Sequence, residues 1–241
     1  MPERTADSES AELARFRRAH GLTLAAACRE IFRSQSHAIQ VRNETIAVEN
    51  LGRIISATLA LSNRQGFASM SLRQLAARAG LSLGGLYAYI SSKTGLVEMI
   101  QAQGRRQMLR VMQDALQEPV AASDRLAAAI RAHLLLSEAM RPWFHFLYME
   151  ARLLPTGPRQ AAIRSELESE DLFAGLIADG VEAGDFRAVN PRTTASLLKP
   201  LLQDWYLKHR KHSDRGLTAG RYADSVTDLM LHYLQAPDTG D

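Results

Sequence analysis

Apolar residues recur along most of this chain with the three- to four-residue spacing of amphipathic helices. In the segment 44–64 this spacing predicts a buried stripe made of Leu51, Ile54, Ile55, Thr58 and Leu59. Asn43 is suited to cap the start of that helix, and Gly66 to end it. No segment alternates strongly with a period of two, so the pattern predicts an all-α fold.

The same spacing predicts helices on both sides of this segment. Two helices precede it, after a polar start over residues 1–10 that is expected to fray. A long helix over 96–117 follows it and stops before Pro119, which cannot continue a helix. The complete set of further helices is 11–19, 23–34, 96–117, 123–141, 143–149, 160–183, 191–208 and 218–234, with loops expected at 155–158 and 209–216. The segment 143–149 is apolar on nearly every side, which is typical of a buried helix.

The stretch 71–93, SLRQLAARAGLSLGGLYAYISSK, predicts two short helices joined by a tight turn. Gly80 can adopt the positive φ that often ends a helix, and Ser82 is a good N-cap for the second helix. Ala76 is small enough for the helices to cross, and Leu86 lies on the face that can pack against the first helix. This arrangement is typical of a helix-turn-helix motif, whose second helix enters the DNA major groove.

Over about residues 44 to 100 the chain also resembles the DNA-binding domain of the TetR family of transcriptional regulators. The resemblance is carried by Ala76, Ala79-Gly80-Leu81-Ser82, Gly84, Leu86-Tyr87, Tyr89, Ser92-Lys93 and Leu96. Gly85, Ile90 and Thr94 depart from the family's pattern. Adjacent glycines lower the helix propensity of the second helix by about 1 kcal/mol each relative to alanine.

The resemblance implies an all-helical homodimer with a three-helix DNA-binding head and a ligand-binding body. We expect an N-terminal helical extension over 1–43, a helix-turn-helix DNA-binding domain over 44–100 and a ligand-binding and dimerisation domain over 101–241. The helix over 96–117 is expected to be the only continuous connector between head and body. The helices over 191–208 and 218–234 are expected to form the dimer interface, because their apolar content exceeds what one internal face needs.

The extension has two interpretations. The favoured interpretation is a helical hairpin packed on the head. The alternative is a DNA-contacting arm that uses Arg15, Arg17 and Arg18.

The resemblance also implies which residues meet double-stranded operator DNA. Phosphates are bound by hydroxyls, cations and backbone amides. The expected DNA-binding residues are Ser71, Arg73, Ser82, Leu83, Gly84, Gly85, Tyr87, Tyr89 and Lys93. Tyr87 and Lys93 are interpreted as phosphate contacts; the alternatives are a core aromatic for Tyr87 and an indifferent surface side chain for Lys93. Few side chains here are of the kinds that form bidentate hydrogen bonds with base edges, so these residues do not predict an operator sequence.

Bodies of TetR proteins usually contain a ligand tunnel between helices, and the resemblance implies one here. Its expected lining is Trp143, Phe146, Leu147, Glu150, Arg152, Phe173 and Trp205. The stretch 150–155, the turn 184–186 and Trp205 are similar to the branch of the family that answers to fatty acyl-CoA. A small lipophilic ligand is therefore expected, with acyl-CoA as the favoured candidate. The alternative is that these residues only fill a core.

Composition narrows the remaining classes of function. The chain has 241 residues, a formal net charge of +3 and one cysteine, Cys28, which fits a reducing cytoplasm and excludes an internal disulfide. No apolar run reaches membrane-spanning length, so no membrane partner is expected. His209 and His212 have no further metal ligand at suitable spacing and are read as solvated, as is the acidic cluster over 166–171.

No Walker A motif and no Glu-x-x-His pair is present, so no cofactor, metal site or catalytic residue is predicted. The sequence therefore predicts a cytoplasmic, ligand-responsive DNA-binding transcriptional regulator, specifically a repressor that a lipophilic small molecule releases from its operator. The alternative is a lipid-binding or enzymatic helical bundle that has lost DNA binding.

Overall fold

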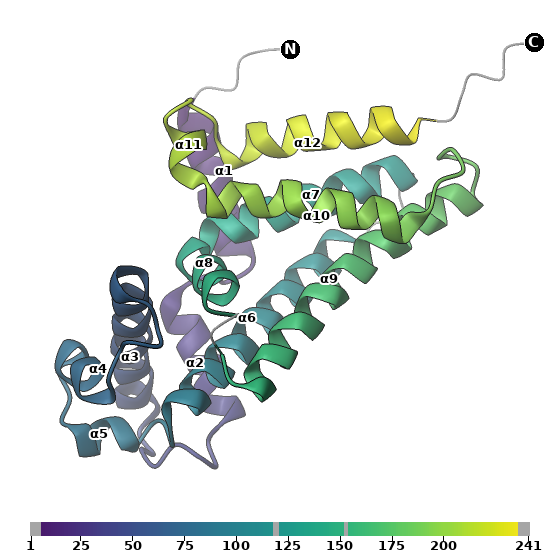
Figure 1. Cartoon of the computed structure of the whole chain (residues 1–241). Coiled ribbons are helices and arrows are strands. Elements are labelled where there is room, and N and C mark those ends of the chain that lie inside the picture. Colours follow the sequence, from purple (N-terminus) through teal and green to yellow (C-terminus); the bar gives the residue numbers. More distant parts are fainter. Residues whose placement is uncertain (1–5, 118–120, 152–153, 236–241) are drawn as a thin grey trace, which may run out of the picture. The chain divides into compact units, whose positions relative to one another are not determined.

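The computed structural model describes residues 6–117, 121–151 and 154–235, and this part of the chain is helical (Figure 1). The helices are α1 (Ala6–Ala19), α2 (Leu24–Ser34), α3 (Glu44–Gln65), α4 (Leu72–Ala79), α5 (Leu83–Tyr87), α6 (Lys93–Ala115), α7 (Ala122–Ala139), α8 (Arg141–Glu150), α9 (Thr156–Glu182), α10 (Pro191–Leu207), α11 (His209–Ser213) and α12 (Ala219–Leu234). The described residues contain no β-strand, and a single isolated bridge joins Phe186 to Gln235. The all-α prediction is confirmed.

The chain divides into two compact units. The head unit comprises Arg17–Gln107 and Pro142–Ile163, and the body unit comprises Met1–Phe16, Met108–Arg141 and Arg164–Asp241. Helices α1, α6, α8 and α9 each contribute residues to both units, α8 through Arg141 alone. The expectation that a single helix connects head and body is therefore wrong, because more than one continuous helix does so. The expected domain boundaries at 43/44 and 100/101 stay a prediction.

The core of the head unit forms around α3 as its hydrophobic pattern predicts. All five residues of the predicted stripe are buried. Asn43 Oδ1 accepts a hydrogen bond from the Ile46 amide at 3.1 Å, and Gly66 ends the helix with a φ of +78°. These two caps satisfy backbone groups that a helix end leaves without partners.

Helix α2 of the N-terminal extension packs against α3 in the head unit. Thr23 caps α2, and Ala27, Cys28 and Ile31 are its buried residues. Burial raises the pKa of the Cys28 thiol to about 12, so this cysteine remains protonated and unreactive.

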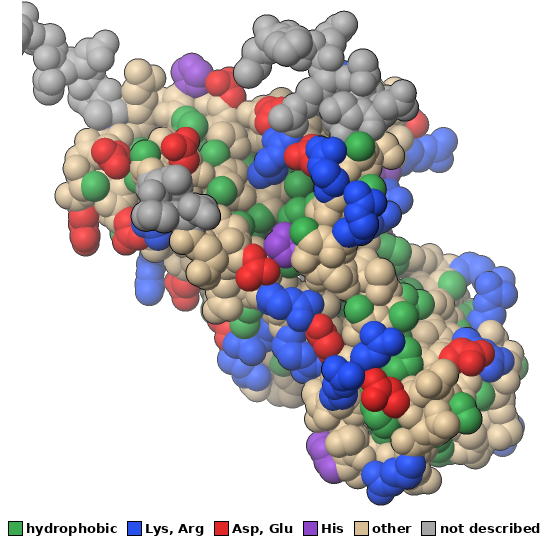
Figure 2. Space-filling model, turned by 180° about the vertical axis from the view of Figure 1, so that it is seen from behind, with side chains coloured by type: hydrophobic (Ala, Val, Ile, Leu, Met, Phe, Trp, Pro, Cys, Tyr) green, Lys and Arg blue, Asp and Glu red, His purple; other side chains and the backbone are tan. Residues whose placement is uncertain are grey.

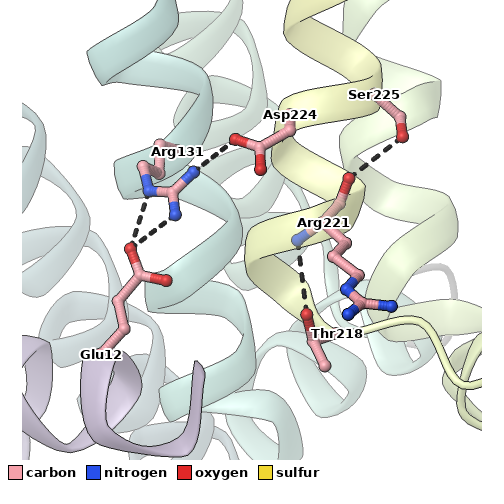
Figure 3. Close-up of polar contacts among 6 residues, drawn as sticks. All are labelled: Glu12, Arg131, Thr218, Arg221, Asp224 and Ser225. Carbon is pink, nitrogen blue, oxygen red and sulfur yellow. Dashed lines mark hydrogen bonds and ion pairs between the residues drawn. The ribbon is translucent and has the colours of Figure 1, made fainter. Parts of the chain in front are cut away.

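Helix α1 is attached differently, through a salt-bridge cluster in the body unit (Figure 3). The Arg131 guanidinium on α7 donates from Nε to Glu12 Oε1 at 2.8 Å and from Nη1 to Asp224 Oδ1 at 2.7 Å. A Cβ at Gly220 would lie 3.0 Å from Glu12 Oε2, so the glycine leaves room for this cluster. The extension is thus not packed on the head alone, and residues 6–10 are helical rather than frayed.

The three arginines of the extension, Arg15, Arg17 and Arg18, lie on α1 and are exposed to solvent. The alternative interpretation of this segment as a DNA-contacting arm stays a prediction.

Two of the expected loops are helical. Helix α9 begins at Thr156, so Gly157 and Pro158 lie in its first turn, where the amide that proline lacks has no partner within the helix. Helix α11 occupies most of the expected loop over 209–216. It follows α10 directly because Asp204 near the end of α10 accepts a hydrogen bond from Lys211 at 3.3 Å and binds His212 at 2.8 Å.

Helix α8 is amphipathic rather than buried on every side. Trp143, Phe146 and Glu150 are buried at the spacing of one helical face, whereas Tyr148 and Met149 are 40% and 52% exposed. None of the helices among the described residues has the length and apolar character that a membrane span requires.

Candidate nucleic-acid interface and ligand site

Helix α4 begins with a capping box. The Ser71 hydroxyl accepts a hydrogen bond from the Gln74 amide at 3.1 Å, and Gln74 Oε1 accepts one from the Ser71 amide at 2.9 Å. Gly80 ends the helix in the left-handed region, with a φ of +67°. Helix α5 follows after Ser82, whose hydroxyl accepts from the Gly85 amide at 3.0 Å. The helix-turn-helix motif therefore forms where its sequence signals predict.

A chain of hydrogen bonds ties the motif to α3. Asn50 Nδ2 donates to the Tyr89 hydroxyl at 2.8 Å, and Asn50 Oδ1 accepts from Arg53 at 3.1 Å. Arg53 also donates to the Gly80 carbonyl at 3.1 Å. A Cβ at Gly80 would displace the Arg53 guanidinium from its present position, and the positive φ of this residue favours glycine. Sequence analysis missed Asn50 and Arg53, since both lie outside the motif.

The predicted DNA-binding residues fall into three groups by solvent exposure. Those exposed to solvent are Ser71, Arg73, Ser82, Gly84 and Tyr87, and those partly exposed are Leu83, Gly85 and Lys93. Tyr87 is 45% exposed, so its alternative as a core aromatic does not hold. Tyr89 is 4% exposed, which makes it part of the head's core. The hydrogen bond from Asn50 then satisfies its buried hydroxyl.

Lys93, the first residue of α6, has two contacts for its side-chain ammonium within the head unit. Its ammonium donates to the Ala68 carbonyl at 2.8 Å and lies 4.8 Å from the centroid of the Phe67 ring. Partial burial lowers the pKa of Lys93, and the negative charge of Glu150 opposes this shift. An ammonium has three N–H donors, so the bond to Ala68 leaves capacity for a phosphate. Lys93 is therefore not an indifferent surface side chain.

Residues 80–84 read Gly-Leu-Ser-Leu-Gly and match the G-x-S-x-G pattern around the nucleophile of α/β-hydrolases. In those enzymes the serine sits on a turn from a strand into a helix. Here the segment joins two helices, and the Ser82 hydroxyl caps α5. The match therefore gives no support for a nucleophilic serine.

Replacing Gly84 by alanine should stabilise the free protein and weaken its binding to DNA. No described atom outside the immediate backbone lies within 4 Å of the added methyl group, and alanine favours a helix by about 1 kcal/mol over glycine. A methyl group would also hold the α5 backbone away from a groove. Urea unfolding and gel-shift titration of a bound genomic fragment measure both effects. Unchanged affinity for that fragment would contradict a close approach of Gly84 to DNA.

Glu150 at the end of α8 is buried in the head unit. Its Oε1 accepts hydrogen bonds from the Ser62 hydroxyl at 2.6 Å and from the Phe67 amide at 3.0 Å. The Phe67 ring meets Phe146 edge to face, with 5.6 Å between centroids. The carboxylate thus joins α8 to the end of α3 and the residues that follow it.

The residues predicted to line a ligand tunnel divide between the two units. Trp143, Phe146 and Glu150 are buried in the head unit, and Leu147 is partly buried there. Phe173 and Trp205 are buried in the body unit. Arg152 lies outside the described residues. The predicted set therefore does not form one cluster within either unit.

Trp205 belongs to an aromatic cluster in the body unit. Its indole Nε1 donates to Glu138 Oε2 at 3.0 Å, and its ring stacks on that of His212 with 5.5 Å between centroids. His212 is 4% exposed, so the prediction that it is solvated is wrong. Its buried position follows from the Trp205 stack and the contact with Asp204.

Asp204 gathers three basic side chains. Partial burial opposes its ionisation, but hydrogen bonds from Lys208, His212 and Lys211 lower the pKa of Asp204 to about 2. Among the described residues, no three His, Cys, Asp or Glu side chains come together as a metal site.

Sequence analysis also missed a buried ammonium in the body unit. Lys199 on α10 is 4% exposed and contacts Ser169 and Glu166 on α9. Glu166 is part of the acidic cluster that the sequence pattern assigns to a solvated face, and it has a buried partner instead. On the face of the molecule shown in Figure 2, Lys and Arg side chains lie among Asp and Glu side chains. This mixture is in keeping with the small formal net charge of +3.

A helix-turn-helix head combined with an all-helical body defines a class of DNA-binding transcriptional regulators. Two family models match the chain: "Bacterial regulatory proteins, tetR family" over residues 54–100, and "Tetracyclin repressor-like, C-terminal domain" over residues 119–234. The chain belongs to the TetR family of transcriptional regulators. A search of curated proteins found no match.

Several solved structures share this fold. The TetR-family regulator PfmR from Thermus thermophilus is 23% identical with a TM-score of 0.67, and the match covers 75% of this chain and 97% of PfmR. The ketosteroid regulator KstR2 of Mycobacterium tuberculosis is 17% identical with a TM-score of 0.66, covering 83% and 99%. FadR from Bacillus subtilis, in complex with stearoyl-CoA, is 18% identical with a TM-score of 0.62, covering 74% and 96%. At these identities the similarity shows the fold alone.

Proposed function

We propose that this regulator is a cytoplasmic repressor that binds operator DNA as a homodimer through α4 and α5 and is released by a lipophilic anion. The observation that carries the DNA-binding part is the exposure of Arg73 on α4, of Tyr87 on α5 and of the N-cap serines of both helices. The hydrogen bonds from Arg53 to the Gly80 carbonyl and from Asn50 to Tyr89 brace this surface from behind. Such bracing holds the motif in one geometry before DNA arrives.

In this proposal Ser71, Tyr87 and Lys93 bind phosphates and set the position of the head on the duplex. Arg73 and Ser82 contribute further polar contacts, and Leu83 with the backbone at Gly84 and Gly85 faces the groove. Tyr89 acts as a positioning residue, because its hydroxyl is held within the head.

Lys93→Ala and Tyr87→Phe should weaken operator binding for every sequence tested, because phosphate contacts carry no base information. Loss of Lys93 should reduce the slope of log affinity against log salt by about one contact. Gel-shift titrations at several salt concentrations measure both quantities. Lys211→Ala, on α11 in the body unit, is the matched control. A variant that changes sequence preference but keeps its overall affinity would contradict these roles.

For the effector we propose a lipophilic anion, with a long-chain acyl-CoA as the first candidate. The body unit contains large buried aromatic side chains, including Phe173 and Trp205. The FadR structure that shares this fold holds stearoyl-CoA. An effector releases DNA only if it binds the DNA-incompetent arrangement more tightly.

Long-chain acyl-CoAs and fatty acids should weaken operator binding by about 5- to 150-fold, the usual range of allosteric coupling. By linkage, operator DNA should weaken effector binding by the same factor. Effector titrations with and without operator DNA, and operator titrations with and without effector, measure the two affinity changes. Binding by neither ligand class, or binding with unchanged operator affinity, would remove the effector assignment alone. Failure to enrich any genomic DNA in a pull-down with sequencing, with or without ligand, would contradict the DNA-binding assignment.

The homodimer is proposed to form through α10 and α12, which pack on each other in the body unit (Figure 1). Leu197 on α10 is 61% exposed, and Leu229 and Tyr233 on α12 are 56% and 41% exposed. Large exposed apolar side chains on two adjacent helices are typical of an association surface.

A further inference from the structure

The buried Lys199 ammonium lies between α9 and α10. Its Nζ donates to the Ser169 hydroxyl oxygen at 2.6 Å and lies 3.6 Å from Glu166 Oε1. Only 5% of the side chain is exposed, whereas 43% of the Glu166 side chain is. A charge removed from water is costly unless it is closely paired, and this pair is loose.

The two side chains that contact Lys199, Ser169 and Glu166, also take part in other hydrogen bonds. The Ser169 hydroxyl uses its own proton on the Glu166 carbonyl at 2.8 Å, so its oxygen can only accept. Glu166 Oε1 also accepts from Gln203 Nε2 at 2.5 Å. An ammonium has three N–H donors. Among the described residues, the two oxygens of Ser169 and Glu166 are its only contacts within hydrogen-bond or ion-pair distance, which leaves one donor without an acceptor.

On α7, the titratable residue that interacts electrostatically with Lys199 is His133. His133 on that helix is 1% exposed, and burial together with the charge of Lys199 lowers its pKa well below the ordinary value, so the ring is neutral. The buried Phe173 ring lies 6.1 Å from His133. Burial lowers the pKa of Lys199, and the negative charges of Glu166 and of the more distant Glu170 on α9 oppose this shift. The buried surroundings thus combine a cation, a neutral imidazole and an aromatic ring.

We propose that Lys199 binds the anionic group of the effector, a compact oxyanion that accepts the third N–H of the ammonium. The proposal rests on the proposed function. A carboxylate and a CoA phosphate share this chemistry, while the apolar part of the effector packs near Phe173. Lys199 faces the interior of the body unit, and Leu197, two residues earlier on α10, is exposed on the proposed dimer surface. An anion bound to Lys199 therefore contacts α10, the helix that also contributes to the proposed dimer interface.

The test compares dodecanoate, dodecanoyl-CoA and neutral dodecanol as probes of the full-length protein. Dissociation constants are measured by calorimetry for the wild type, Lys199→Met, Lys199→Arg and the control Lys211→Met. Lys199→Met should weaken at least one anionic probe by about 10- to 100-fold, the usual worth of a hydrogen bond to a charged group. Its affinity for dodecanol should stay within about twofold, and Lys199→Arg should retain the preference for the anion.

The results distinguish a bound carboxylate from a bound phosphate and can also overturn the role of Lys199. Loss of dodecanoate binding assigns a carboxylate, and loss confined to dodecanoyl-CoA assigns a phosphate. Equal losses for anion and alcohol, or anion affinity unchanged in Lys199→Met, overturn this inference and leave the proposed function standing. A wild type that binds none of the three probes overturns the effector assignment as well. Thermal unfolding checks the fold of each variant, and Lys199→Gln provides the same comparison should the methionine variant not fold.

Discussion

Leu229→Glu should convert the proposed dimer into monomers and weaken operator binding by about 10²- to 10⁴-fold. Leu229 is 56% exposed on α12, beside α10 with its exposed Leu197. A two-fold interface repeats each residue, so one substitution introduces two carboxylates that must be buried. A monomer presents a single head, and operator binding then loses the effective concentration that a linked second head provides.

Light scattering and sedimentation measure the mass of the variant, and gel-shift titration measures its affinity for DNA. Leu167→Glu is the matched control, because Leu167 is 52% exposed on a different helix, α9. A dimeric Leu229→Glu, or a Leu167→Glu that is equally monomeric, would refute the proposed location. The two half-sites of the operator should lie about 34–36 Å apart, or a multiple of that spacing, because each head enters the major groove on one side of the duplex.

Local signals predicted the helix-turn-helix motif closely. Ser71, Gly80 and Ser82 act as the caps that their residue types favour. The spacing of α3 likewise predicted its buried face and both of its ends. These features depend on residues a few positions apart, which is the range over which a sequence pattern is informative.

Contacts between distant segments could not be predicted in this way. Glu12, Arg131 and Asp224 come from three helices, and nothing local to any one of them indicates the other two. The same reason explains why the sequence pattern alone does not place most of α1, up to Phe16, in the body unit. The expected ligand-site residues follow from a resemblance, and the structure divides them between the two units.

Lys199 is a different kind of miss, because its signal was present. On α10 it follows Leu198 and precedes Leu202 by three residues, so helical spacing already places it on the buried stripe. A lysine on such a stripe needs a partner or a function. A pattern defined by apolar positions alone does not include this lysine.

Glu150→Ala should lower the free energy of unfolding by about 3 kcal/mol. The substitution leaves two buried donors, the Ser62 hydroxyl and the Phe67 amide, without their acceptor, and each such loss costs about 1–3 kcal/mol. It also leaves a space beside Phe67, which packs on Phe146. Ser62→Ala removes only one of the two bonds and should cost about 1 kcal/mol.

Urea unfolding measures these differences, with Glu98→Ala as the control, because Glu98 is an exposed glutamate on α6 in the same unit. That control should stay within about 0.5 kcal/mol of the wild type. Glu150→Gln separates charge from hydrogen bonding, because its amide oxygen can still accept from Phe67 while the negative charge near Lys93 is lost. If Glu150→Ala unfolds at the same urea concentration as Glu98→Ala, the carboxylate does not hold α8 to the head. If Glu150→Ala is destabilised and Glu150→Gln is not, hydrogen bonding rather than charge makes that connection.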